Sequence, residues 1–163
     1  MASGGVCLLS GSFKEGFGKE VSPYRRLLAA IDNSYMSARV FERALILSQS
    51  SCSILYAVNV IQTKLPYAKT SPVALEPAYY DLMRAASKEL FEVAIKRGKA
   101  VGVEVEPVQL EGDPAEEILK FAHDNDVDLI VVGSKDKIGS VKNLGSASSR
   151  IAVEAKCAVL IER

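Results

Sequence analysis

Apolar residues gather along this chain into short continuous runs that alternate with stretches of helical spacing. Runs of almost wholly apolar residues predict buried strands at residues 27–31, 54–60, 129–132 and 158–161. In a further segment, residues 101–105, valine alternates with glycine and glutamate, which predicts a strand with one solvent-exposed face. Pro107 follows it. Because proline cannot donate a ladder hydrogen bond, we expect this strand at or near a sheet edge.

Between these strands, apolar residues recur at the three- and four-residue spacing of helices. One such pattern begins around Ser34, and a longer one is expected to end at Gly98. Residues 113–116 read DPAE, which combines an N-cap acid, a proline at the first helical position and a capping-box acid. A fourth helix is expected after Gly145, and residues 61–74 are expected to form a long loop.

Five strands alternating with four helices indicate an α/β fold, an open five-stranded parallel sheet of Rossmann-like type with helices on both faces. We expect the strand order 3-2-1-4-5, which reverses between the first and fourth strands. Ligands of such folds bind at the carboxyl ends of the strands at that reversal. Asp32 and Gly133 would then be neighbours.

Residues 1–22 are glycine-rich and show no sustained period of apolar residues. We therefore expect a flexible or loosely docked extension, followed by a domain over residues 23–163.

Composition narrows the classes of partner. Lysine plus arginine and aspartate plus glutamate both number 20, and this zero net charge argues against a nucleic-acid partner. No apolar stretch is long enough to span a bilayer, so no membrane partner is expected. The three cysteines are odd in number and lack metal-ligand spacing, which favours a reducing, cytoplasmic location. Cys52 and Cys157 each precede an apolar run and are expected to be packed small hydrophobes.

The segment at residues 128–149 carries the most chemical information. It reads as a buried strand that stops at Gly133, a loop bearing lysines, and a helix opened by Gly145 and Ser146. Backbone N–H groups and the positive end of a helix dipole would point the same way there, which favours a phosphate-bearing ligand. The same parts also build an ordinary strand–loop–helix unit, so the segment alone leaves both interpretations open.

Several stretches, taken in order, resemble the universal stress protein family: LLAAIDNS, SILYAVNV, EGDPAEEILKFAHDNDVDLIVVGSK, LGSAS and KCAVLIE. The resemblance covers the chain from about Tyr24 to Arg163. It implies an ATP site, with or without magnesium, at the strand-order reversal. Ala30, Asp32 and Val58 would lie around adenine and ribose. Val132 and Gly133 would cover the nucleotide. The phosphates would meet Gly145, Ser146 and Ala147.

The nucleotide-binding branch of that family has a glycine, two residues, a second glycine, nine residues, and then Gly-Ser or Gly-Thr. Gly133 and Gly145 match the outer glycines, but Asp136 replaces the second one and eight residues, not nine, follow it. A carboxylate that faces phosphates repels them, although the positive charges of the lysines at 135, 137 and 142 would offset this repulsion. These departures predict that the adenosine end of ATP is held better than the phosphate end.

Some residues have two interpretations. Asp32 is either a nucleotide ligand or a carboxylate that caps the next helix. The loop lysines either neutralise phosphate or are simply solvated. Ser146 is expected to cap its helix in both cases. His123, the only histidine, has no partner motif that would make it catalytic, and we expect it on the solvent side or the flank of its helix.

Three hypotheses follow. The first is a cytoplasmic universal stress protein that binds adenine nucleotide without strong catalysis. The second is a non-nucleotide member of the family that acts as a dimeric interaction protein. A nucleotide hydrolase ranks last, because no general base or metal-ligand cluster is evident. We also expect a homodimer through the strand at residues 158–161, since that apolar strand would form an open sheet edge.

Overall fold

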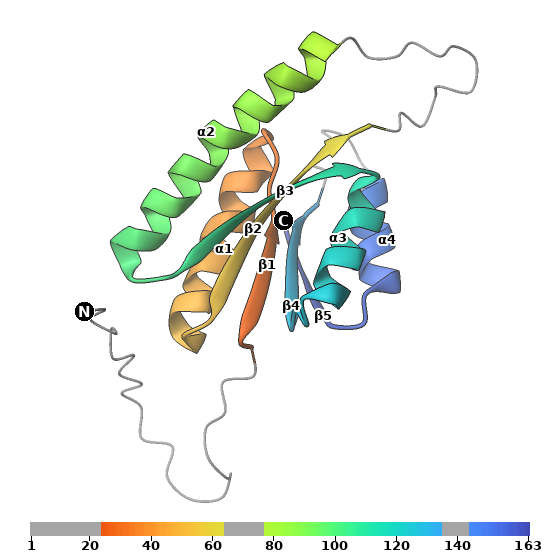
Figure 1. The fold of residues 1–163 in the computed structure, drawn as a ribbon. Coiled ribbons are helices and arrows are strands. Elements are labelled where there is room, and N and C mark those ends of the chain that lie inside the picture. The colour runs from red at the N-terminus through yellow and green to blue at the C-terminus, as the bar shows by residue number, and fades with distance from the viewer. Residues whose placement is uncertain (1–23, 64–76, 135–143) are drawn as a thin grey trace, which may run out of the picture.

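The computed structural model of the protein describes residues 24–63, 77–134 and 144–163. Five strands form one sheet between two layers of helices (Figure 1). The strands are β1 (Arg26–Ala30), β2 (Ile54–Gln62), β3 (Val105–Gly112), β4 (Leu129–Gly133) and β5 (Ala158–Glu162). The helices are α1 (Tyr35–Ser51), α2 (Pro77–Val101), α3 (Pro114–Asp124) and α4 (Ser146–Glu154). The extension expected at residues 1–22 lies outside the described residues.

The sheet has the predicted topology. Its order is β3-β2-β1-β4-β5 and every strand pair is parallel. Helices α1 and α2 cover one face, and α3 and α4 cover the other (Figure 1). Leu27 and Leu28 are adjacent in β1 and both fully buried, one in each of the two cores. Side chains of a central strand therefore alternate between two apolar layers, which explains its uninterrupted apolar sequence.

The predicted boundaries around β3 were wrong, although its edge position is confirmed. β3 begins at Val105, and the valines before it belong to the end of α2 and the connection. Gly98 does not end the helix. It lies inside α2, where an added Cβ would be 2.3 Å from Cγ2 of Val105, so the glycine allows close approach to the sheet. The chain leaves the helix at Gly102, whose φ of +74° is the left-handed value that glycine tolerates.

Two further boundary expectations have clear outcomes. Asp113 caps α3 as predicted, because its carboxylate accepts a hydrogen bond of 3.0 Å from the N–H of Glu116 and Pro114 follows it directly. The loop expected from residue 61 starts later, since β2 continues to Gln62 along the full length of β3.

Cysteine positions depart from expectation in part. Cys52 is exposed at the end of α1, in the left-handed conformation, and it is disulfide-bonded. It is therefore not a packed small hydrophobe. Cys157 is a free, half-buried thiol directly before β5, and burial raises its pKa. Within the described ranges, no helix is long and apolar enough to cross a membrane.

Candidate nucleotide site

The seam between β1 and β4 opens toward the carboxyl ends of the two strands. Their register runs from Leu27 opposite Leu129 to Ala29 opposite Val131, and it goes no further. This is also the point where the strand order reverses. A parallel sheet offers a ligand-binding crevice at such a point.

Beyond the last residues paired between β1 and β4, β1 continues beside β2 and β4 continues beside β5. The N–H of Ile31 donates to the carbonyl of Val58 in β2, at 2.8 Å. The N–H of Ser134 donates to the carbonyl of Glu162 in β5, at 2.9 Å. Because β1 stays paired with β2 while β4 stays paired with β5, the two strands no longer pair with each other here. We call this place, between their carboxyl ends, the crevice.

Asp32 stands at the end of β1 on this opening and is exposed. Its Oδ1 accepts hydrogen bonds from the N–H of Ser34, at 2.8 Å, and from the hydroxyl of Ser37, at 2.7 Å. The N–H of Asp32 in turn donates to the Ser37 hydroxyl. Ser34 is the N-cap of α1 and no side chain caps that helix, so the capping interpretation of Asp32 was wrong. The two hydrogen bonds instead close a turn before α1 and fix the direction of the Asp32 side chain.

Gly133 lies where α1 crosses the end of β4. An added Cβ would be 3.2 Å from Cβ of Met36 and 3.3 Å from Cγ2 of Val40, both on α1. These distances are tighter than ordinary side-chain contacts. The missing side chain therefore lets helix α1 pack closely where the crevice opens.

The N-terminus of α4 meets the same place. Gly145 is the N-cap and no side chain caps the helix, so the prediction that Ser146 acts as the cap was wrong. The hydroxyl of Ser148 instead donates to the carbonyl of Gly133, at 2.6 Å. The first intrahelical bond is donated by the N–H of Ser149 to Gly145. Helix geometry leaves the preceding N–H groups without an intrahelical acceptor, and this end of the helix carries positive partial charge.

Comparison with known proteins shows the family of this chain. Residues 23–163 match the Universal stress protein family. Universal stress protein YxiE of Bacillus subtilis (strain 168) is 34% identical over 151 residues, which cover 86% of this chain and 99% of that protein. The chain belongs to the universal stress protein family.

Two solved structures of the same fold have adenine nucleotides bound. The universal stress protein from Archaeoglobus fulgidus in complex with dAMP aligns with a TM-score of 0.63 at 22% identity, covering 86% of this chain and 98% of that one. A universal stress protein in complex with cAMP aligns with a TM-score of 0.62 at 24% identity, covering 86% and 97%. These similarities, each over 86% of this chain, confirm the fold.

The residues predicted for the site fall into two groups in this family member. Val58 and Val132 are 1% and 2% exposed and belong to the core beneath α3 and α4. Ala30 and Ala147 are partly buried against the same core. Without rearrangement, the two valines could meet a ligand only through their backbone. Four residues stand at the opening itself: Asp32, Gly133, Gly145 and Ser146. Lys135, Asp136, Lys137 and Lys142, which decide the phosphate prediction, lie outside the described residues.

An ion cluster lies beside the crevice, at the end of β5. Glu162 is 8% exposed and binds two arginines of α1, at 2.9 Å to Nε of Arg43 and 3.2 Å to an Nη of Arg39. The hydrogen bond from Arg43 is the main reason that the pKa of Glu162 lies below its ordinary value of 4.5. The cluster ties α1 to the strand next to β4, and so helps to hold the outer side of the crevice.

Three residues that support the site were missed from the sequence. Asn59 and Ser87 form a buried hydrogen-bonded pair behind the end of β1, and Ser148 joins α4 to β4. A polar asparagine inside the apolar run at residues 54–60 was the available signal. A serine on the buried side of a long helix was a second, weaker one.

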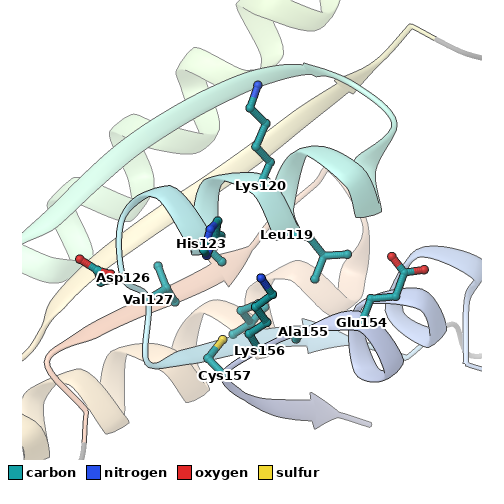
Figure 2. Close-up of a pocket in the computed structure, with 11 residues that line it drawn as sticks. Leu119, Lys120, His123, Asp126, Val127, Glu154, Ala155, Lys156 and Cys157 are labelled. Carbon is teal, nitrogen blue, oxygen red and sulfur yellow. The ribbon is translucent and has the colours of Figure 1, made fainter.

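A cavity of about 410 Å³ lies at the opposite end of the sheet, between the C-terminal parts of α3 and α4 (Figure 2). His123, Lys156 and Cys157 are among the residues that line it, and His123 is exposed as expected. Lys120 points away from the space between the two helices (Figure 2). Helix C-termini carry negative partial charge, so this end of the fold suits a phosphate less well than the crevice does. Across the described part of the chain, no cluster of acids, histidines or cysteines could hold a metal ion.

Proposed function

We propose that this protein binds an adenine nucleotide, ATP among them, in the crevice between β1 and β4, and acts as a nucleotide-responsive stress protein without strong catalysis. The observation that carries this proposal is the split seam with the N-terminus of α4 beside it. We expect the base and ribose to lie at this split. The N-terminal N–H groups of α4 suit a phosphate, because they and the helix dipole favour negative charge.

The ligand-bound relatives support the same class of ligand. One holds dAMP and another holds cAMP, both adenine nucleotides with a single phosphate. For this chain we propose that Asp32, with Ala30 and the backbone of Val58, holds adenosine. Val132, Gly133, Gly145, Ser146 and Ala147 would surround the remainder of the nucleotide. Asp136 would weaken the hold on the outer phosphates of ATP.

Titration of the purified protein with ATP and with adenosine, with and without magnesium, tests the proposal. At about 100 times its dissociation constant, a ligand should stabilise the fold by roughly 2.7 kcal/mol, which a thermal-shift assay detects. Asp136→Gly should tighten ATP binding more than adenosine binding, because it removes a like charge near the phosphates alone. If millimolar ATP leaves the melting temperature of both proteins unchanged, the second hypothesis, a dimeric interaction protein, replaces the first.

We also propose a homodimer that pairs two copies of β5. Among the described strands, β5 pairs only with β4, so its other edge is open. Ala158 is exposed and its N–H donates inward to Asp128. By the alternation of a strand, the N–H of Val159 points outward. Val159→Pro removes an outward donor and keeps the inward bonds, so it should yield a monomer in sedimentation. A wild-type monomer at tens of micromolar, roughly the range of weak interfaces, would contradict the proposal.

A further inference from the structure

A buried polar pair stands behind the carboxyl end of β1. Asn59 of β2 is 7% exposed and Ser87 of α2 is 3% exposed. The side-chain amide of Asn59 donates to the carbonyl of Ile31 at 2.8 Å, and the hydroxyl of Ser87 lies 2.6 Å from Oδ1 of Asn59. Burying an amide is unfavourable unless its hydrogen bonds are made, and here they are made.

Two neighbouring residues of β2 hold the two backbone groups of Ile31, and Asn59 of the pair is one of them. The N–H of Ile31 is held by the carbonyl of Val58, and its C=O is held by the Asn59 amide. Both bonds run to β2, on the side away from β4. Ile31 directly precedes Asp32, so these bonds set where the chain leaves the sheet and how the Asp32 carboxylate is placed.

Helix α2 contributes Ser87, which holds the side chain of Asn59 in place. Besides Asn59, the hydroxyl of Ser87 lies 3.0 Å from the carbonyl of Met83, one turn earlier in α2. The side chain of Asn59 lies on the face covered by α1 and α2, because its neighbour Val58 faces α3 and α4. The pair is therefore separated from the proposed nucleotide position by the sheet itself.

We propose that Asn59 and Ser87 are positioning residues of the nucleotide site. They hold the end of β1 against β2, and thereby keep the crevice open and Asp32 in place without touching the ligand. This inference rests on the proposed function, because it gives the pair its role through the adenosine end of that site.

Ser87→Ala is the sharpest test, with Ser48→Ala as its matched control. Ser48 is a fully buried helical serine too, but its hydroxyl bonds to the carbonyl of Ser53, before the amino end of β2. Both variants lose one buried hydroxyl and should lose similar stability. We expect Ser87→Ala to weaken adenosine binding by about two- to tenfold in calorimetry, the range of one lost hydrogen bond. Ser48→Ala should leave the affinity unchanged, and Ser87→Thr should restore it.

Hydrogen exchange in the ligand-free protein separates this inference from the proposed function. The amide of Ile31 should exchange faster in Ser87→Ala than the global loss of stability explains, and it should not do so in Ser48→Ala. Equal exchange at Ile31 in the two variants, or equal adenosine affinity, would overturn the positioning role. A wild-type protein that binds no adenosine would overturn the nucleotide role, while the exchange measurement would still decide whether the pair holds β1.

Discussion

The two ends of the β1–β4 seam differ although the same two strands form both. At the amino end, Oδ2 of Asp128 accepts hydrogen bonds from the N–H groups of Arg25, at 2.7 Å, and Arg26, at 2.9 Å. The N–H of Asp128 donates back to the carbonyl of Arg26, at 2.9 Å. At the carboxyl end, the register stops at Ala29 and Val131.

The difference shows that a few side chains decide where a parallel sheet is closed and where it opens. A carboxylate joins the strands at one end. At the other end, Asn59 draws β1 toward β2, and Glu162 ties β5, the partner of β4, to α1. Helix termini reinforce the contrast, since α4 brings its N-terminus to the open end. We therefore expect changes at the closed end to alter stability alone, and changes at the open end to alter binding as well.

Asp128→Ala should have the largest effect on stability. It removes the acceptor of two backbone N–H groups, and hydrogen bonds to charged groups contribute about 1.5–3 kcal/mol each. We expect a loss of about 2 kcal/mol or more in urea unfolding, with unchanged nucleotide affinity. Asp124→Ala is the control, because this exposed acid at the end of α3 should cost almost nothing. A clear loss of affinity in Asp128→Ala would mean that the two ends are not independent.

Gly133→Ala should have an intermediate effect on stability and a clear effect on binding. The new methyl group would press on Met36 and Val40 at 3.2 and 3.3 Å, so α1 must shift by a few tenths of an ångström. Overpacking of this kind costs about 1–3 kcal/mol, and we expect the lower end of that range in thermal unfolding. Adenosine affinity should fall together with stability. Unchanged affinity would separate Gly133 from the site.

Glu162→Gln should have the smallest effect, and that effect should depend on pH. Because pairing lowers the pKa of Glu162 from 4.5, the carboxylate stabilises the fold above that value, and this stabilisation is lost as the pH falls through the lowered pKa. Both arginines are about half exposed, so we expect a loss of at most about 1 kcal/mol at neutral pH. The difference in free energy of unfolding between variant and wild type should shrink as the pH falls below 4.5. A gap independent of pH would contradict the ion-pair explanation.

Much of the fold was predictable because its signals are local. Apolar runs and caps such as Asp113 predicted five strands and four helices, and the alternation of the two predicted the parallel sheet and its order. The error around residues 98–105 has a tertiary cause. In the sequence, Gly98 looks like a glycine that ends a helix. In the structure it lies inside α2, and the lack of a side chain there lets α2 pack closely on Val105. No local pattern distinguishes these two uses of glycine.

The site was predictable only as a location. The reversal of strand order placed Asp32 and Gly133 at one edge, but the sequence cannot say that Val58 and Val132 turn their side chains into the core. It also cannot pair Asn59 with Ser87, which are 28 residues apart and meet only when α2 packs on the sheet. Long-range polar contacts of this kind require the folded chain.

Amide chemical shifts measured during titration with adenosine and ATP test the location of the ligand most directly. We predict that the amides of Asp32, Gly133, Ser146 and Ala147 shift and saturate with one dissociation constant. Those of Arg26, Asp126 and Cys157, at the closed end of the sheet and beside the cavity in Figure 2, should stay unchanged. Saturable shifts confined to the closed end, with none at the crevice, would contradict our assignment of the nucleotide site.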